Sequence, residues 1–545
     1  MQLETLTAKA LTARTLIECG MFAPARPDRL VLALKAISDW GPTTAGGYTA
    51  SAVRYPDAVS IIDDAGSLTF GEVHRRTNAL AHAWSDEGIV EDDSVALLCR
   101  NHRGFVEAMV ACSKLGADAL FLNTAFSGPQ LAEVCEREQP RAIVYDEEFD
   151  DLVARAAPDS RRFVAWSDGG SPRAGAELLE TLIERGDPSD VVVPATKGRI
   201  VILTSGTTGT PKGANRKLPE TLDPIAALIE KIPLRARERT LIAAPLFHSW
   251  GLAHLILGIA LSSTLILQRR FDPQDALSAI DEHGATALIA VPVMLQRMLE
   301  LGPRTLGRYD TGSLRVIAAS GAALPGELAT KVMDAFGDIL YNLYGSTEVA
   351  WATVATPEDL RAAPGTAGRP PRGTVVRLYD ADDREVGRGE TGRIFVGNEL
   401  CFDGYSDGGN KALVDGLMSS GDVGHFDEGG RLFVDGRDDE MIVSGGENVF
   451  PREVEDAIAT LDGVEEVAAV GVQDAQFGQR LRAFVVVGDA ATVSEQDVKA
   501  HVRANLARFK VPREVVFVDE LPRNATGKVL KRELVEDAGA TPAQR

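Results

Sequence analysis

Short apolar runs alternate with helical patterns along the N-terminal half of the chain. Apolar strands are indicated at "VALLC" from Val95, "ADALFL" from Ala117 and "AIVY" from Ala142. The segment between the first two, "RGFVEAMVACSKL" from Arg103, has the pattern of a helix. Continuous apolar strands separated by helices are typical of parallel sheets covered on both faces. The pattern therefore predicts an α/β fold, in which sheets are layered with helices.

Polar positions mark where some of these elements begin. Thr69 is followed three residues later by Glu72, which forms a capping-box signature for a helix running through Trp84. The same alternation of strand and helix continues through "LIAVP" near Ile289 and "RVIAAS" at Arg315. The large N-terminal part of the chain is therefore expected to form one α/β region.

The pattern changes after residue 436, where "GRDDEMIVSGGENVFPREVE" brings a charged, glycine-containing stretch between apolar blocks. Pro451 suits the first turn of a helix, and Ser494 is placed to cap another. Between them, "VEEVAAVGV" and "RAFVVV" have the composition of strands. These signals predict a domain junction followed by a small α+β domain.

One long uncharged segment could be mistaken for a membrane span. From Thr240 to Leu267 the chain has no Asp, Glu, Lys or Arg, and this length would cross a bilayer. Pro245, Gly251 and the pair Ser262 and Ser263 break it into strand, loop, helix and strand-sized pieces. We therefore expect no integral membrane segment here, but a buried core that also forms the wall of a pocket.

Composition narrows the range of partners. The 545 residues include 57 Lys and Arg against 79 Asp and Glu, a formal charge of −22, which argues against a general nucleic-acid binder. The five cysteines are odd in number and scattered, and the N-terminus lacks a secretory signal, so a cytoplasmic location is expected. Peripheral membrane contact and homo-oligomerisation stay open.

The segment "TSGTTGTPKG" at residues 204–213 directly follows the apolar run "VILT". A strand that leads into a Ser/Thr/Gly loop presents backbone N–H groups to an anion, and phosphate is the natural candidate. The loop departs from the P-loop pattern, because Lys212 is flanked by Pro211 and Gly213. A surface loop without a ligand is the structural alternative.

The loop is similar, residue for residue, to the phosphate loop of the adenylate-forming superfamily, which includes acyl-CoA synthetases. Four further segments resemble the family's other motifs in order and spacing: "YGSTE" at 344–348, "SGD" at 420–422, the stretch from residue 436, and "PRNATGKVLKREL" from 522. The resemblance runs from about residue 50 to the end. It implies a large N-terminal domain at 1–436, a hinge at 437–440 and a small mobile C-terminal domain at 441–545.

What the resemblance implies is a two-step reaction that uses ATP, Mg²⁺ and CoA. A carboxylate attacks the α-phosphate of ATP to give an acyl-adenylate and pyrophosphate, and a thiol then displaces AMP. The phosphate loop would contribute Thr204, Ser205, Gly206, Thr207, Thr208, Gly209 and Lys212. In the second motif Tyr344 would stack on adenine, Thr347 would contact the α-phosphate and Glu348 would bind Mg²⁺, with Gly345 and Ser346 beside the nucleotide. Gly321, Ala322 and Ala323 would line the adenine pocket.

Later motifs are implied to supply the remaining contacts. Asp422 would accept hydrogen bonds from the ribose hydroxyls and Arg437 would add a second ribose contact. Lys528 would bridge the carboxylate and the α-phosphate during adenylation. Asp439, or its neighbour Asp438, would be the hinge about which the C-terminal domain rotates. After rotation Ser444, Gly445 and Gly446 would leave a narrow path for the pantetheine of CoA.

The apolar segment "PLFHSWGLAHLILGIALSS" occupies the position of the family's acyl pocket, with His248 near the substrate carboxylate. It has no acidic residue to pair with an ammonium group, which disfavours an amino-acid substrate. Small residues such as Gly251 among Leu and Ile favour a medium- or long-chain fatty acid. The leading hypothesis is therefore a fatty-acyl-CoA synthetase. A fatty-acyl-AMP ligase loading a carrier protein, an aryl-CoA ligase and a catalytically silent nucleotide-binding protein are the alternatives.

Overall fold

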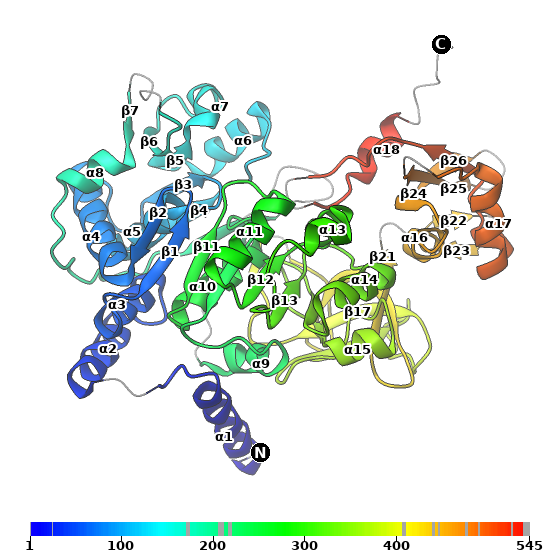
Figure 1. The fold of residues 1–545 in the computed structure, drawn as a ribbon, viewed down its shortest axis with the longest axis horizontal. Helices are drawn as coiled ribbons and strands as arrows, with labels where there is room; N and C mark the ends of the chain where they lie inside the picture. Colours follow the sequence, from blue (N-terminus) through cyan, green and yellow to red (C-terminus); the bar gives the residue numbers. More distant parts are fainter. Residues whose placement is uncertain are drawn as a thin grey trace. The chain divides into compact units, whose positions relative to one another are not determined.

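The computed structural model divides the chain into two compact units (Figure 1). One unit comprises Met1–Ala318 with Phe402–Asn410, and the other comprises Ala319–Cys401 with Lys411–Arg545. The residues described are 2–23, 26–169, 175–204, 212–215, 221–405, 410–438, 442–444, 447–474, 478–488, 491–524 and 527–537. Residues 437–440, the expected hinge, belong to the second unit, and both this hinge and the domain boundaries expected from the sequence stay predictions.

The first unit contains an eight-stranded sheet in the order β18-β9-β8-β4-β3-β5-β6-β7. Its strands are β3 (Ser94–Leu98), β4 (Asp118–Phe121), β5 (Ala142–Asp146), β6 (Arg161–Trp166), β7 (Ala176–Leu178), β8 (Ile200–Thr204), β9 (Lys212–Asn215) and β18 (Gly404–Tyr405). All neighbouring strands from β8 to β7 are parallel, whereas β9 and β18 are antiparallel additions. The predicted apolar strands at Val95, Ala117 and Ala142 are therefore confirmed, as is their parallel arrangement.

A second sheet of this unit has the strand order β12-β10-β11-β1-β2. Its strands are β1 (Val59–Asp63), β2 (Gly66–Thr69), β10 (Arg239–Ile242), β11 (Thr264–Leu267) and β12 (Ala287–Ala290), and β13 (Val316–Ala319) follows at the unit boundary. The uncharged segment 240–267 is divided among β10, helix α10 (Ser249–Ala260) and β11, as its breaking residues predicted. In the part of the chain that the structure describes, no helix is both long and apolar enough to cross a bilayer.

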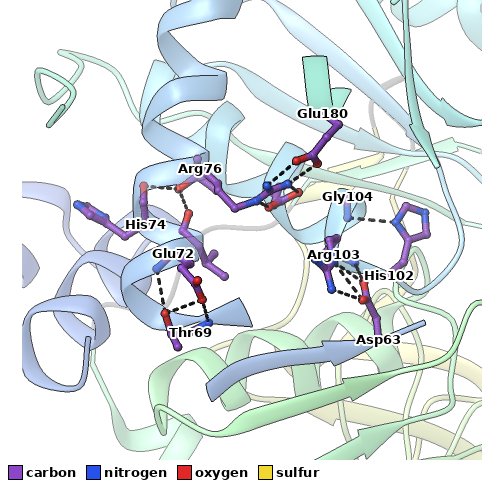
Figure 2. Close-up of polar contacts among 12 residues, drawn as sticks. Asp63, Thr69, Glu72, His74, Arg76, His102, Arg103, Gly104 and Glu180 are labelled. Carbon is purple, nitrogen blue, oxygen red and sulfur yellow. Dashed lines mark hydrogen bonds and ion pairs between the residues drawn. The ribbon is translucent and has the colours of Figure 1, made fainter. Parts of the chain in front are cut away.

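Most helices of this unit pack against these sheets, whereas α1 packs against α9 (Figure 1). Besides α10, the helices are α1 (Gln2–Glu18), α2 (Pro27–Trp40), α3 (Thr44–Arg54), α4 (Phe70–Asp86), α5 (Arg103–Leu115), α6 (Gly128–Glu138), α7 (Asp150–Ala156), α8 (Leu179–Arg185), α9 (Asp223–Lys231), α11 (Pro273–His283), α12 (Pro292–Glu300) and α13 (Gly302–Leu306). The capping box at the start of α4 is formed as predicted. The Glu72 backbone N–H donates to Thr69 Oγ1, and the Thr69 backbone N–H donates to Glu72 Oε2 at 2.7 Å (Figure 2).

An ionic cluster with one fully buried member connects α4, α5 and α8. The Arg76 guanidinium donates to Glu107 Oε1 at 2.5 Å and to Glu180 Oε2 at 2.6 Å, and Figure 2 shows Arg76 and Glu180 facing one another. Glu107 is only 2% exposed. Nearby, Arg103 at the start of α5 donates to the Asp63 carboxylate at the end of β1. These ion pairs fix the helices against the sheet edge, because a buried carboxylate requires a partner that compensates its lost hydration.

Lys114 is fully buried on α5 without a direct carboxylate partner among the described residues. Its Nζ donates to Thr77 Oγ1 at 2.8 Å, to Asn78 Oδ1 at 2.5 Å and to the His74 carbonyl at 3.0 Å. Burial lowers the pKa of Lys114 to about 7, against a small opposing effect of Asp190. Burial and the charge of Lys114 also lower the pKa of His74 to about 4, although His74 Nε2 contacts Asp190 at 3.1 Å.

This buried lysine predicts a distinctive dependence of stability on pH. Free lysine titrates near pH ~10.4, so between pH 7 and that value the unfolded chain binds more protons at this position than the folded chain. The free energy of unfolding should therefore rise with pH across this window. From pH 7 to 9.5, we expect the melting temperature of the wild type to rise relative to that of Lys114→Met. Parallel pH profiles of the two proteins would contradict the assignment.

The second unit contains a short antiparallel pair, β14 (Leu340–Tyr344) with β15 (Thr353–Ala355), beside α14 (Gly326–Phe336) and α15 (Pro357–Ala362). An antiparallel sheet follows in the order β16-β17-β20-β19, with β21 paired to β20. Its strands are β16 (Val375–Tyr379), β17 (Gly392–Gly397), β19 (Leu413–Val414), β20 (Leu417–Phe426) and β21 (Leu432–Arg437). The end of β14 and the β20–β21 hairpin carry several of the predicted nucleotide-binding residues.

The C-terminal part of this unit is α+β, as the sequence predicted. It has a sheet ordered β23-β22-β25-β24, with β26 on β25. The elements are β22 (Ile442–Ser444), β23 (Glu447–Val449), α16 (Pro451–Ala459), β24 (Val464–Asp474), β25 (Gly478–Val487), α17 (Glu495–Asn505), β26 (Glu514–Phe517) and α18 (Lys531–Asp537). Ser494 caps α17 through a capping box with Asp497, and Val498, Val502 and Ile458 pack in one core. This core holds the sheet and the two helices together.

Candidate active site

The predicted phosphate loop begins and ends on paired strands. β8 and β9 are antiparallel neighbours, and the backbone of Thr204 at the end of β8 lies opposite that of Lys212 at the start of β9. The two strands therefore run in opposite directions on either side of the loop. Ser205, Gly206, Thr207, Thr208 and Gly209 lie outside the described residues. Their role as phosphate ligands stays a prediction.

The predicted acyl-pocket wall is built from the start of α10. His248 immediately precedes this helix and is half-buried, and burial lowers the pKa of its imidazole to about 4. The ring is therefore neutral at pH 7 and can accept or donate one hydrogen bond without carrying charge. Trp250 follows two residues later, where its indole Nε1 donates to the Ala290 carbonyl at 3.1 Å. This bond ties the first turn of α10 to β12.

Gly251 does not line an open channel, contrary to the expectation that its small size widens the acyl pocket. A Cβ at this position would lie 2.3 Å from the Pro245 carbonyl oxygen and 2.7 Å from the Ala244 oxygen. Glycine is required here because α10 packs directly on the backbone of the preceding loop. A larger residue at 251 would displace this loop rather than shorten a cavity.

Three predicted nucleotide-binding residues come together in the second unit. The Tyr344 hydroxyl, at the end of β14, donates to Asp422 Oδ2 at 2.6 Å and lies 3.1 Å from Ser420 Oγ. Asp422 on β20 is directly opposite Arg437 on β21, with Arg437 Nε 3.6 Å from Asp422 Oδ1. An aromatic ring at the end of β14, a carboxylate in the middle of β20 and a guanidinium at the end of β21 are thus presented together.

Burial dominates the electrostatics of this group. Asp422 is only 9% exposed, and burial raises its pKa, while the hydrogen bond from Tyr344 and the charges of Arg437 and Lys528 act in the opposite direction. Burial and the Asp422 charge raise the pKa of Tyr344 well above its ordinary value. Tyr344 is therefore a neutral hydrogen-bond donor at physiological pH, which orients the Asp422 carboxylate.

The turn that follows Tyr344 is compact. A Cβ at Gly345 would lie 2.0 Å from the Ala350 carbonyl oxygen, so glycine permits the turn to close. The Ser346 hydroxyl donates to Glu348 Oε2 at 2.8 Å and accepts the Glu348 backbone N–H at 3.3 Å. Thr347 and Glu348 are both half-buried. The turn thus positions a hydroxyl and a carboxylate beside Tyr344.

Asn398 supports this turn and was not identified from the sequence. Its Nδ2 donates to the carbonyls of Val349 and Trp351, each at 2.9 Å. These bonds connect the loop after β17 to the residues directly after Glu348. An asparagine within a loop gives no signal of its partners in sequence, because the two carbonyls lie almost 50 residues earlier in the chain.

The other predicted contacts are placed as follows. Gly321, Ala322 and Ala323 form the bend after β13, where Gly321 has φ of 88° and the three residues are exposed or half-buried. Ser444 ends β22, and its backbone is paired with Glu447 and Gly478. Asp439, Gly445 and Gly446 lie outside the described residues, whereas Asp438 follows β21. The hinge and the path for CoA are therefore predictions from the sequence.

Lys528 is exposed in a tight loop before α18. The Asn524 side chain accepts the Lys528 backbone N–H at 2.9 Å, and the Asn524 backbone N–H donates to the Lys528 carbonyl at the same distance. Gly527, with φ of 77°, closes the loop, and its carbonyl accepts a bond from Arg523 at 2.6 Å. The backbone of Lys528 is therefore fixed, while the residue is exposed and its charge acts on Asp422.

A cluster of possible metal ligands elsewhere has a structural explanation. Cys99, His102 and Asp146 are buried with ligand atoms within 4.8 Å of one another. His102 Nδ1 accepts the Gly104 N–H at 3.1 Å, so Nε2 carries the proton and donates to Asp146 Oδ1 at 2.7 Å. The Arg100 N–H donates to the other oxygen of Asp146. These hydrogen bonds occupy both ring nitrogens of His102 and join the start of α5 to the end of β5. Figure 2 shows the bond between His102 and Gly104.

Comparison with known proteins relates this chain to enzymes that use ATP. The AMP-binding enzyme profile matches residues 48–406, and that of the AMP-binding enzyme C-terminal domain matches residues 453–528. A feruloyl-CoA synthase of Amycolatopsis sp is 33% identical over 484 residues, covering 88% of this chain and 96% of the relative. The long-chain-fatty-acid–CoA ligase FadD13 of Mycobacterium tuberculosis is 30% identical over 485 residues, covering 87% and 94%. The crystal structure of ATP-bound MatB from Rhodopseudomonas palustris superposes with a TM-score of 0.78 at 27% identity, covering 90% of this chain and 98% of that one.

Proposed function

This chain belongs to the family of AMP-binding enzymes, and from that premise we propose how its site works and which acid it activates. It is an AMP-forming acid–thiol ligase of the adenylate-forming superfamily, with ATP-dependent acyl- or aryl-CoA ligase activity. A carboxylate attacks the α-phosphate of ATP, pyrophosphate leaves, and the thiol of CoA then displaces AMP from the acyl-adenylate. The two profile matches and the large fraction of each relative covered support both steps of this reaction.

The contact between Tyr344 and Asp422 is the main observation that supports a nucleotide site here. Because the Tyr344 hydroxyl occupies Asp422 Oδ2, the carboxylate is fixed in one orientation, with Oδ1 toward Arg437. We infer that this carboxylate accepts the ribose hydroxyls, Arg437 adds a second contact and the Tyr344 ring stacks on adenine. Gly321, Ala322 and Ala323 would then line the adenine pocket, since small residues allow a flat ring to approach the backbone.

Charge on the phosphates is balanced by residues from the other motifs. We propose that the loop from Thr204 to Lys212 holds the β- and γ-phosphates and that Thr347 contacts the α-phosphate. Glu348, supported by Ser346, offers hard oxygen ligands, which suits Mg²⁺ because this ion is commonly bound by one or two carboxylates together with substrate phosphates. Bound Mg²⁺ would neutralise negative charge on the phosphates, and the protein would position the substrate carboxylate relative to the α-phosphate.

The acid is proposed to lie along α10, with its carboxylate near His248. The neutral imidazole expected from the lowered pKa of His248 would not compete as a cation with Lys528. Lys528 would then bridge the carboxylate and the α-phosphate during adenylation. Because α10 is predominantly apolar and mostly buried, a fatty acid is the first proposal. The Trp250 ring at the start of the helix equally favours an aromatic acid, which is the second candidate.

Rotation of the C-terminal domain about Asp439 is proposed to separate the two steps. The 444–446 segment, with Ser444, Gly445 and Gly446, would then replace Lys528 at the site and leave room for pantetheine. We place the enzyme in the cytoplasm, where ATP and CoA are available and where its five cysteines, which are all free thiols, would stay reduced. Its proposed partners are the acid and CoA.

Pyrophosphate release tests this function directly. The protein would be incubated with ATP, Mg²⁺ and a panel of straight-chain, aromatic and amino acids, each with and without CoA. We expect CoA-dependent turnover for aliphatic or aromatic acids and none for amino acids, since the described part of α10 has no acidic side chain for an ammonium group. Adenylate that accumulates despite CoA would instead indicate a carrier-protein ligase. ATP binding without pyrophosphate release for any acid would refute the ligase assignment.

A further inference from the structure

His254 is a buried histidine of α10 that the proposed reaction does not use. It is only 2% exposed, and its Nδ1 lies 3.1 Å from the Trp250 carbonyl one helical turn earlier. A carbonyl oxygen only accepts hydrogen bonds, so Nδ1 must carry the proton. Nε2 is therefore a bare acceptor. No group in the described part of the chain donates to this nitrogen.

The surroundings keep this ring neutral and in one orientation. Burial lowers the pKa of His254 to about 4, despite the opposing hydrogen bond to Trp250. The Trp250 ring stands edge-on to the imidazole, with centroids 4.1 Å apart and planes at 71°. At neutral pH the tautomer is thus fixed, and Nε2 stays an acceptor rather than becoming a donor.

His254 lines a narrow cavity between α10 and the sheet. The other lining residues include Leu257, Gly258 and Leu261 from α10 and its C-terminal end, Thr240 of β10, and Ser263 just before β11. Its volume of about 10 Å³ accommodates one water molecule or the terminal group of a ligand. Arg235 and Glu238, which precede β10, also line the cavity, so its wall combines apolar side chains with polar and charged ones.

An unpaired buried acceptor is costly, so a partner is expected. Leaving such a group unsatisfied costs about 1–3 kcal/mol. The partner must donate, which restricts it to an O–H or N–H group. A carboxylate, ether or plain hydrocarbon cannot satisfy Nε2.

The helix also fixes where that donor lies. His248 directly precedes α10, and His254 is six residues further along the chain. At a rise of 1.5 Å per residue the two are about 9 Å apart along the axis. If the substrate carboxylate binds near His248, a donor that reaches His254 must be about 9 Å away from it.

We propose that His254 is a specificity residue that selects carboxylic acids bearing a hydrogen-bond donor about 9 Å from the carboxylate. This inference rests on the proposed function, because it places the acid along α10. Two substrate classes meet the requirement: an aromatic acid such as para-hydroxycinnamic acid, and an alkyl acid such as ω-hydroxyheptanoic acid. The shared chemistry is a terminal hydroxyl that donates to Nε2.

Two matched pairs of acids test the proposal. The value of kcat/KM would be measured for para-hydroxycinnamic against cinnamic acid and for ω-hydroxyheptanoic against heptanoic acid. We expect the wild type to prefer the hydroxylated member of at least one pair by about 10- to 100-fold, the range given by one or two net hydrogen-bond energies. The pair that shows the preference identifies the substrate as aromatic or aliphatic.

His254→Phe removes the nitrogen but keeps a flat ring, and it should abolish the preference by lowering turnover of the hydroxylated acid alone. His82→Phe is the matched control, because His82 on α4 also has a buried Nε2 without a partner among the described residues but does not line this cavity. It should retain the wild-type preference. If His254→Phe does not fold, as judged by its melting curve, His254→Leu provides the second variant, because leucine also lacks a hydrogen-bond acceptor and should likewise abolish the preference.

A ¹⁵N NMR titration of the wild type gives a readout that is independent of turnover. The His254 Nε2 resonance should shift when a non-hydrolysable hydroxylated acyl-adenylate analogue binds, and should shift much less with its deoxy counterpart. A wild type that turns over acids without discriminating within either pair, or equal shifts with both analogues, would overturn the proposal and assign the cavity to a water molecule. Absence of pyrophosphate release for every acid would instead refute the proposed function.

Discussion

Replacing Lys528 by alanine is expected to lower the rate of acyl-adenylate formation by on the order of 10² to 10³. The proposed role of this lysine is to place a positive charge between the carboxylate and the α-phosphate as negative charge develops there. Thioester formation begins from an adenylate that is already complete, so it does not need this charge. We therefore expect Lys528→Ala to convert a supplied acyl-adenylate and CoA to acyl-CoA at nearly the wild-type rate.

The local structure makes this experiment interpretable. The bonds between Lys528 and Asn524 involve only the Lys528 backbone, and the side chain is exposed, so truncation should leave the loop intact. Lys499→Ala on α17 is the matched control, because Lys499 lies in the same C-terminal part and outside the predicted site. The control should retain both half-reactions. Equal loss of both half-reactions in Lys528→Ala would count against the assignment.

The strands and helices were largely predictable because their signals are local. The apolar runs at Val95 and Ala142, the capping box at Thr69 and the breaks in the 240–267 segment depend on neighbouring residues alone. Helices α1 to α3 and the antiparallel sheet from β16 to β21 were not identified. Antiparallel strands with one exposed face alternate polar and apolar residues over few positions, and this gives a weaker pattern than a buried strand.

The site was predictable as a set of motifs but not as a set of contacts. Tyr344 and Asp422 were each assigned to the nucleotide, yet their direct hydrogen bond spans 78 residues and is created by the fold. Gly251 was expected to widen a channel, whereas it allows α10 to pack on the backbone at Pro245. No role in substrate binding was predicted for His254 from the sequence. Its importance depends on which nitrogen is bonded, and no sequence pattern contains that information.

The ion pair between Arg76 and the buried Glu107 was likewise not predictable from the sequence. Breaking it is the second change for which we expect a large effect. Arg76→Met should destabilise the first unit by about 3–5 kcal/mol, because it leaves the Glu107 carboxylate buried without its cation. Burial already raises the pKa of Glu107 in the intact protein, with Arg76 as the main opposing influence. A clear fall in melting temperature is therefore expected. Arg161→Met is the control, since Arg161 pairs with Glu87 at the surface, where such pairs contribute about 0–1 kcal/mol.

The charge on Glu107 can be separated from packing by two further measurements. Adding Glu107→Gln to Arg76→Met removes the uncompensated charge, so the double variant should regain part of the lost stability. Because burial raises the folded-state pKa of Glu107, the charged carboxylate is less stable in the folded chain than in the unfolded chain, and it lowers the free energy of unfolding at the higher pH values where it is ionised. The deficit of Arg76→Met relative to the wild type should accordingly shrink as the pH falls and Glu107 is protonated. A deficit that is independent of pH and unchanged by Glu107→Gln would mean that Arg76 stabilises the helices by packing alone.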